Sequence, residues 1–545
     1  MTKRMNLIEK TMVIKRIYVF LIGCFILFSI CTNCTNRSNS DFVRIEGDHF
    51  EIENDTFFPL MLNYMVSFQS NGNCFIVEPS TTYDSLHYED AVGKKAVKDQ
   101  LMGHFGLIKD LGFNTVRICF DRVGQDEDGR YFYQADRKFY LDKKKDRKAI
   151  FRGLDRLLTV AEKQGLKVML LIKPPFVENN DLQIFTKELL NYFKNCPTLF
   201  AYDFMNEPIY FDPCEDRKKM EAVAIVSQWK KMMLEHAPHQ LFTIGFSEPI
   251  ETFEWDCSVL PVDFVEVHTY HPLRVPSEIY WFSRHCGKPW MIGETGLPAD
   301  NDSITYEAQA QFVREAYQLT RDAGGCGFGL WEFQENPGGT YEASYTGLLR
   351  HGGETHTTRN GDYTIKGTLK PAARVIATLE QNYRPKMQIL PANYYNMVGY
   401  KNIRIKGRIL DTVTGAGIEG AVIRGWNENW SVGMNTYSDE NGCFELYCND
   451  PCTHFEISAA GYSKIKFDRS IDFVPLSKNA GDIHNLPQKE LEYHMISYHP
   501  FVKKEIPDTC FFKVMNFDPE LFHQAIWEGD LGTCHLDKLD KPATL

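Results

Sequence analysis

The sequence predicts an α/β fold, a (β/α)8 TIM barrel followed by a small all-β sandwich domain. Between residues 41 and 382, eight short apolar runs alternate with amphipathic segments, as strands and helices alternate in such a barrel. After residue 401 the apolar runs become short, alternate with polar residues and are separated by turn residues. A doubly wound open sheet is the rival, but the glycine-rich phosphate loop that usually follows its first strand is absent from the sequence.

Length and composition agree with a soluble protein of more than one domain. The chain has 545 residues, of which 43% are hydrophobic and 24% are charged, and its net charge is −12. This negative charge argues against nucleic acid as a partner. Aromatic residues make up 13% of the chain, which suits a sugar-binding cleft and equally a large core.

Residues 1–40 are predicted to be an export signal and a polar linker. Lys15 and Arg16 precede an apolar run over residues 17–30, which is shorter than the ~20 residues of a membrane span. The cysteine that ends this run resembles the acylated cysteine of a bacterial lipoprotein signal. Cys31 and Cys24 each fit that pattern only in part, so membrane anchoring through one of them and simple secretion both stay open. We expect the protein in the periplasm, at the cell surface or outside the cell.

The barrel domain is predicted to span residues 41–382 and to begin with a hairpin around Glu46-Gly47-Asp48, which could plug the bottom of the barrel. The eight strands are expected at 58–63, 114–120, 167–172, 200–207, 240–245, 263–270, 290–294 and 327–333. Apolar residues at helical spacing predict helices at 97–111, 154–161, 185–193, 220–236, 277–285 and 306–323.

A linker is predicted at residues 383–400 and the sandwich at 401–470. Its strands are expected at 403–410, 420–425, 442–447 and 455–458. Residues 471–545 show poor periodicity and stay unassigned; they either complete the sandwich or pack against the barrel. The 15 cysteines are scattered singly, without the paired spacing of metal ligands.

Two glutamates stand where apolar runs end. Glu207 follows the run 198–205, and Glu294 follows the run 289–292. A single glutamate at a strand end is usually a solvated cap. The carboxyl ends of barrel strands, however, meet at one face, where active sites of this fold lie. The two carboxylates are therefore the candidate acid/base pair.

The motifs around these glutamates resemble retaining glycoside hydrolases of the cellulase type, glycoside hydrolase family 5, across about residues 41–380. The matching positions are Arg117, Asn206-Glu207-Pro208, His268-Thr269-Tyr270, Glu294 and Trp331. The resemblance implies that Glu207 is the general acid/base and Glu294 the nucleophile. It also implies that Arg117 lies beside the nucleophile and that Trp331 stacks on sugar. We further expect Tyr270 to donate to Glu294, and Asn206 to a sugar hydroxyl.

Each supporting residue also has a plainer interpretation. Arg117 could neutralise Asp203 inside the barrel, His268 could be a core histidine, and Trp331 a core aromatic residue. Asp203, Glu266 and Glu332 are expected to be structural or to contact substrate. One position departs from the family: the third strand ends at Lys173 where a histidine is usual. This departure puts the sugar contacts near the cleavage point in doubt.

The small domain resembles the carboxypeptidase regulatory-like fold through turn and core positions, including Asp439-Glu440-Asn441-Gly442 and Ala460-Gly461-Tyr462. This resemblance implies a fold and no chemistry. A spacer or attachment module is the expected role, with glycan binding second.

The sequence thus predicts an exported retaining glycoside hydrolase that cleaves a β-linked polysaccharide or oligosaccharide of the β-glucan or mannan type. We expect no cofactor and no metal, a glycan as the partner, and a monomer. The alternative is a catalytically impaired barrel that serves as a carbohydrate-binding or adhesive surface protein.

Overall fold

The computed structural model describes residues 41–71, 74–79, 94–135, 137–214, 217–270, 274–335, 344–357, 364–379, 402–428, 433–476, 478, 480–481, 483 and 525–540. The predicted export signal, with Cys24 and Cys31, and the whole of the predicted linker 383–400 lie outside these residues. Among the helices described, none is both long and apolar enough to cross a membrane.

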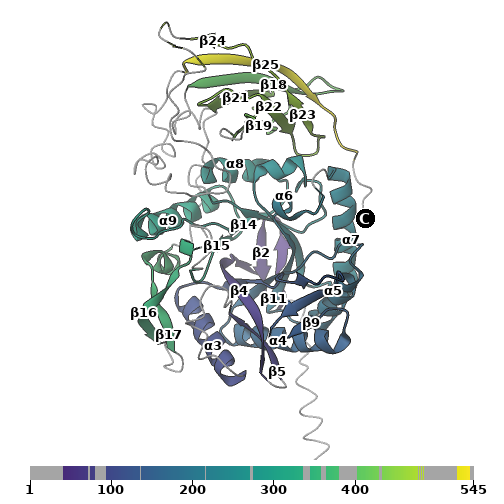
Figure 1. Cartoon of the computed structure of the whole chain (residues 1–545), viewed down its shortest axis with the longest axis vertical. Coiled ribbons are helices and arrows are strands. Elements are labelled where there is room, and N and C mark those ends of the chain that lie inside the picture. The colour runs from purple at the N-terminus through teal and green to yellow at the C-terminus, as the bar shows by residue number, and fades with distance from the viewer. Residues whose placement is uncertain are drawn as a thin grey trace, which may run out of the picture.

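Eight parallel strands form a closed barrel, which confirms the predicted fold (Figure 1). In barrel order they are β4 (Leu60–Asn71), β6 (Thr115–Cys119), β10 (Lys167–Leu171), β11 (Leu199–Asn206), β12 (Leu241–Phe246), β13 (Val265–His268), β14 (Trp290–Glu294) and β15 (Phe328–Leu330). The last strand pairs with the first, where Phe328 is opposite Leu60. The strands begin and end within two or three residues of the predicted runs, because apolar residues on both faces mark buried parallel strands clearly. The exception is β4, which extends well beyond its predicted run.

Helices pack around this barrel and bury their apolar faces against it. They are α3 (Lys94–Asp110), α4 (Lys144–Lys163), α5 (Asn180–Phe193), α7 (Lys219–His236), α8 (Val275–His285) and α9 (Tyr306–Asp322). The start of α4 lies ten residues before the predicted one. Its first turns carry the charged run Lys143-Lys144-Lys145-Asp146-Arg147, in which the apolar periodicity is hidden.

The predicted N-terminal hairpin closes the bottom of the barrel. Strands β1 (Arg44–Glu46), β2 (His49–Ile52) and β3 (Asp55–Phe57) form a small antiparallel sheet. Phe50 of β2 is fully buried and makes edge contacts with Phe200 and Phe264, with ring centroids 6.2 Å and 5.0 Å away. Together with Met61, Met169 and Met291 these rings fill the lower barrel.

Three additions to the barrel were missed by the sequence analysis. Strand β4 runs on past the barrel and forms a hairpin with β5 (Cys74–Pro79). A three-stranded sheet, β7 (Gly124–Gln125), β8 (Tyr131–Gln134) and β9 (Lys138–Tyr140), follows β6, and a hairpin of β16 (Leu349–Thr357) and β17 (Thr364–Leu369) follows β15. These strands are short or mostly polar, so they lack the apolar runs that revealed the barrel strands.

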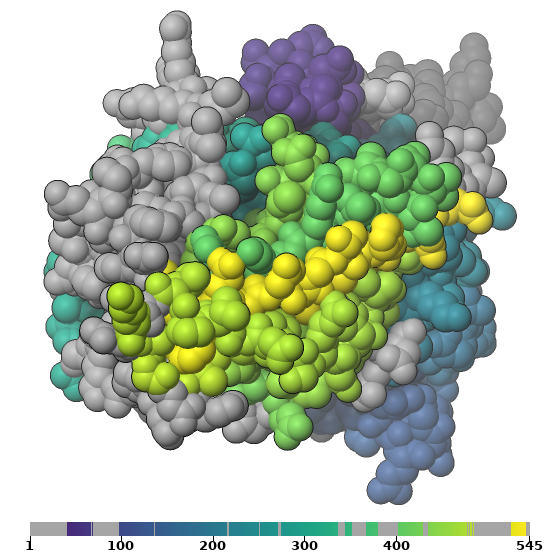
Figure 2. Space-filling view, turned by 90° about the horizontal axis from the view of Figure 1, so that it is seen from above, coloured from purple at the N-terminus to yellow at the C-terminus, as the bar shows by residue number. Residues whose placement is uncertain are grey.

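The second domain is a sandwich of two four-stranded sheets. One sheet has the order β21 (Cys443–Cys448), β18 (Ile403–Asp411), β25 (Trp527–Leu536), β24 (Val474–Pro475). The other has the order β20 (Gly433–Tyr437), β19 (Val422–Trp426), β22 (His454–Ser458), β23 (Ile465–Asp468). Part of the tail that the sequence left unassigned therefore completes the sandwich: β25 pairs in parallel with β18 and runs along the surface of the domain, in yellow in Figure 2.

The sandwich packs directly on the barrel, beside α8 in Figure 1. The indole nitrogen of Trp281 in α8 donates to the carbonyl oxygen of Gly420 at 2.8 Å. Val422 of the sandwich is fully buried in the cluster of side chains that forms the barrel core. The two domains therefore share a continuous packed interface.

Candidate active site

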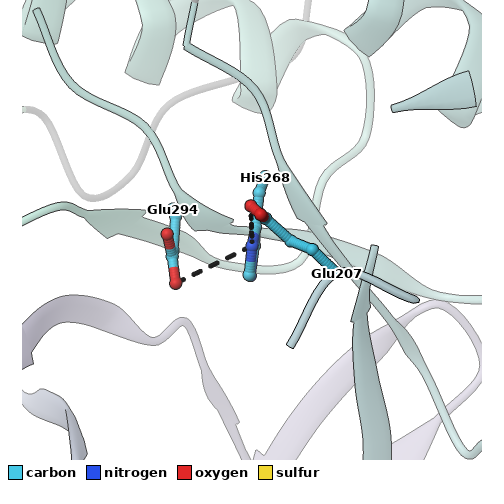
Figure 3. A group of neighbouring side chains, drawn as sticks. All are labelled: Glu207, His268 and Glu294. Carbon is cyan, nitrogen blue, oxygen red and sulfur yellow. Dashed lines mark hydrogen bonds and ion pairs between the residues drawn. The ribbon is translucent and has the colours of Figure 1, made fainter. Parts of the chain in front are cut away.

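The carboxyl ends of β11, β13 and β14 bring Glu207, His268 and Glu294 together. One polar atom from each of the three side chains lies within 4.8 Å of the other two. The ring of His268 stands between the two glutamates (Figure 3). The two acidic residues, 87 positions apart in the sequence, therefore face one shared space, as expected for strands four and seven of a barrel.

Glu207 is held at the end of β11 in an unusual backbone conformation. Its φ angle is +40°, in the left-handed region that few residues other than glycine adopt. Nδ1 of His268 lies 2.9 Å from Oε1 of Glu207 and 3.7 Å from Oε1 of Glu294. The side chain of Glu207 is 16% exposed, whereas that of Glu294 is 6% exposed, so Glu207 is the more accessible of the two.

Arg117 of β6 lies beneath the two glutamates and is completely buried. Its guanidinium contacts Glu294 and lies 2.6 Å from Asp203 and 3.0 Å from Glu266. It also donates to Oδ1 of Asn206 at 3.0 Å. Both interpretations of Arg117 thus describe its contacts, because one guanidinium neutralises Asp203 and also binds Glu294.

The buried acidic groups outnumber the buried cations, and this imbalance shifts their pKa values. Burial opposes protonation of His268, but Glu294, Glu207 and Glu266 outweigh it and raise the pKa of the imidazole to about 10. Burial and the charge of Glu266 raise the pKa of Asp203 to about 7, against the lowering effect of Arg117. Near neutral pH, His268 is therefore a cation and its Nδ1–H donates to Glu207.

Two glycines allow this close packing of charged side chains. A Cβ atom at Gly293 would lie 2.1 Å from Oε1 of Glu266, and one at Gly245 would lie 2.7 Å from the His268 ring. Such contacts are far shorter than any real Cβ contact. A side chain at either position would displace a neighbour of Glu207 or Glu294.

The remaining predicted residues also lie at this site. The Tyr270 hydroxyl donates to Oε2 of Glu294. Oδ1 of Asn206 faces Arg117, which orients the amide group next to Glu207. Trp331 follows β15, is half-buried and packs against Met65, Cys119 and Leu171. Trp331 therefore combines a partly exposed ring with the packing of a core aromatic residue.

The structure adds Asn63 of β4, which the sequence analysis missed. Its Oδ1 accepts from Arg117 at 2.9 Å, and its Nδ2 donates to the carbonyl oxygens of Gly293 and Leu330. The available signal was a polar residue that ends the apolar run 60–62. Lys173, in place of the usual histidine, is exposed, and its charge acts on Asp121.

Glu207, His268 and Glu294 are also the kinds of residue that bind metal ions. A metal ligand must offer the lone pair of a neutral imidazole, however, and the surrounding carboxylates keep His268 protonated. The arrangement places two carboxyl groups and one imidazole around a shared space.

Comparisons with solved structures give the following distant likenesses. No family model and no curated protein matches the sequence. Among solved structures, the chain is similar to an endo-1,4-β-mannanase from Rhizomucor miehei, at 14% identity and a TM-score of 0.39 over 56% of this chain and 97% of that one. It is also similar to an exo-β-1,4-mannosidase from Opitutaceae bacterium strain TAV5, at 16% identity and a TM-score of 0.42 over 62% of this chain and 61% of that one.

A third similar structure is a hyperthermophilic endocellulase from Pyrococcus horikoshii, with 14% identity and a TM-score of 0.39 over 58% of this chain and 95% of that one. Likenesses this distant carry no argument about the activity of this chain. The chemistry has to be argued from its own residues.

Proposed function

We propose that this protein is an exported retaining glycoside hydrolase that cleaves a β-linked polysaccharide or oligosaccharide by double displacement. Glu207 is the general acid/base and Glu294 is the nucleophile. The observation that carries this proposal is the short separation of the two carboxylates: one oxygen of Glu207 lies within 4.8 Å of one oxygen of Glu294. Retaining enzymes hold their carboxyl groups ~5 to 5.5 Å apart, whereas inverting enzymes need ~6.5 to 9.5 Å to admit a water molecule.

The contacts of each glutamate support the division of roles. Glu294 is bound by Arg117 and Tyr270, two donors that orient its carboxyl group as a nucleophile. Glu207 is more exposed, and its Oε1 lies 2.9 Å from Nδ1 of His268, so it is placed to exchange a proton with a leaving oxygen. In the first step, Glu294 attacks the anomeric carbon and Glu207 protonates the departing sugar. In the second step, Glu207 takes a proton from a water molecule whose oxygen attacks the anomeric carbon, and the bond between that carbon and Glu294 breaks.

The other residues bind and orient the sugar in this proposal. The amide nitrogen of Asn206 is directed away from Arg117 and can donate to the hydroxyl next to the anomeric carbon. Trp331 offers a half-buried ring on which a sugar face can stack. Export, through a secreted form or a lipid anchor on Cys31 or Cys24, places the enzyme where polysaccharides occur.

The test is a glycan panel of β-glucans, mannans and xylans with the wild type and Glu294→Gln. We expect hydrolysis by the wild type and a loss of at least roughly 10³-fold in Glu294→Gln with binding and folding retained. A wild type that binds glycans but hydrolyses none would contradict the proposal and favour a carbohydrate-binding surface protein.

A further inference from the structure

A short segment after β12 lies between the turn that carries Glu207 and the sandwich domain and makes hydrogen bonds to both. This segment, residues 249–256, begins with the 3-10 helix η2 (Pro249–Phe253). It carries Glu251, which is 2% exposed and has no role in the chemistry described above. The segment packs against the Glu207 turn, defined as residues 206–211, on one side and against the sandwich on the other.

Glu251 binds the backbone of the Glu207 turn. Its Oε1 accepts from the backbone N–H of Ile209 at 3.0 Å, and its Oε2 accepts from the N–H of Ser247 at 2.8 Å. Ile209 lies in α6 (Pro208–Phe211), directly after Glu207. The N–H groups at the start of a helix have no partner within the helix, so the carboxyl group of Glu251 satisfies one of them.

This support matters because the Glu207 backbone is strained. A glutamate at a φ of +40° persists only where surrounding contacts hold it. The N–H of Glu207 donates to the carbonyl oxygen of Gly245, and Glu251 fixes the chain two residues later. Removing the contact between Glu251 and Ile209 allows the backbone of the Glu207 turn to relax toward a negative φ angle at Glu207. This relaxation would move the Glu207 carboxyl group.

The sandwich holds the opposite side of the same segment. Oγ of Ser458 donates to the carbonyl oxygen of Thr252 at 2.7 Å, and the N–H of Gly461 donates to Oδ2 of Asp256 at 2.8 Å. The buried ammonium of Lys219 lies 3.1 Å from Asp256 and donates to the carbonyl oxygens of Ala459 and Tyr462. A buried cation with this set of partners fixes their geometry closely.

We propose that Glu251 is a positioning residue for Glu207, and that the sandwich stabilises this arrangement by binding residues 249–256. The inference rests on the proposed acid/base role of Glu207. It assigns the sandwich a part in catalysis that a spacer or attachment module does not have. Misplacing a catalytic group by about 1 Å can cost roughly 10²-fold in rate, so a shift of this turn is measurable.

The experiment compares two aryl β-glycosides of the sugar that the glycan panel identifies, one with a phenyl and one with a dinitrophenyl leaving group. Phenolate needs a proton from the general acid, whereas dinitrophenolate departs without one. A misplaced Glu207 therefore lowers kcat/KM for the phenyl glycoside selectively. A general loss of structure lowers kcat/KM for both substrates equally.

In the full-length protein, we expect kcat/KM on the phenyl glycoside to fall roughly 10-fold in Glu251→Gln and roughly 10²-fold in Glu251→Ala. On the dinitrophenyl glycoside, kcat/KM should fall about threefold or less in both variants. Ser458→Ala should show the same selectivity with a smaller loss, and it keeps the proposal testable if the Glu251 variants do not fold. The matched control is Asp126→Asn, since Asp126 also accepts from two backbone N–H groups, those of Asp128 and Arg130 in the turn between β7 and β8.

Equal losses on both substrates, no loss, or the same selectivity in Asp126→Asn would overturn the proposal. Glu207→Ala, measured in parallel, separates the two claims. If Glu207→Ala shows no leaving-group selectivity, the acid/base assignment itself fails. If Glu207→Ala is selective and the Glu251 variants are not, only the positioning role fails.

Discussion

Nδ1 of His268 lies 2.9 Å from a carboxylate oxygen of Glu207 and is held protonated by the acidic residues around it. The same ring is 3.7 Å from Glu294, so one cation stands between the two glutamates. This arrangement lets two carboxyl groups share a small space without strong repulsion. The proposed chemistry therefore depends on a buried charge network as well as on the two glutamates.

The charge on His268 makes stability depend on pH. Because the folded pKa of about 10 lies above the ordinary value of 6.5, the stabilisation is complete below pH 6.5 and is lost as pH rises toward 10. We expect the free energy of unfolding to fall across this window by up to ~1.4 kcal/mol per pH unit, the slope for one proton. His268→Gln should flatten the slope, measured by urea denaturation at several pH values. An unchanged slope in the variant would contradict the assignment.

Arg117 is the only cation in the described residues that contacts Asp203, Glu266 and Glu294 together. Arg117→Met leaves these buried carboxylates without it and should cost roughly 3–5 kcal/mol of unfolding free energy. The matched control is Arg408→Met on the exposed surface of the sandwich, where we expect a change within ~0.5 kcal/mol. Chemical denaturation measures the free energy of unfolding of both variants. A loss in Arg117→Met as small as that in Arg408→Met would show that the network contributes little to stability.

Tyr270→Phe removes one hydrogen bond to Glu294 and leaves the ring in place. A hydrogen bond to a charged group contributes ~1.5–3 kcal/mol, so kcat/KM should fall roughly 10- to 10²-fold. The control is Tyr133→Phe, because Tyr133 is buried and its hydroxyl donates to the carbonyl oxygen of Phe120 and not to a glutamate. Steady-state kinetics should show a loss for Tyr270→Phe alone, and equal activity of both variants would exclude this role for Tyr270.

Phe50 tests the hairpin at the bottom of the barrel. Phe50→Ala should lower the free energy of unfolding by roughly 3–5 kcal/mol, because removal of a fully buried ring that packs against Phe200 and Phe264 leaves a cavity. Activity per folded molecule should stay unchanged, since the hairpin lies at the opposite end of the barrel from the glutamates. Val413→Ala, at an 88% exposed position, is the control. A loss of activity without a loss of stability would contradict this description of the hairpin.

The barrel could be predicted because its strands are buried on both faces and read as continuous apolar runs. Trp290–Glu294 was predicted to the residue, and Glu294 stood out because it ends such a run. Strands β7 to β9 were missed because only Phe132, Tyr133 and Phe139 are buried in them, so no apolar run marks them.

The site could be predicted only as far as strand ends and motifs reach. The candidates Glu207, Glu294, Arg117 and Tyr270 could be predicted because each lies on or next to a barrel strand. Glu251 lies in a 3-10 segment, and its contact to Ile209 joins residues 42 positions apart. Neither spacing nor composition marks such a contact, which depends on the three-dimensional course of the loop.

The stereochemistry of cleavage tests the central claim most directly. Proton NMR of the hydrolysis reaction, recorded before the product sugar mutarotates, identifies the first anomer formed. Two carboxylates with one oxygen of each within 4.8 Å of the other predict a β-anomer from a β-linked substrate, that is, retention. A first product with the α configuration would contradict the double displacement and the role of Glu294 as nucleophile.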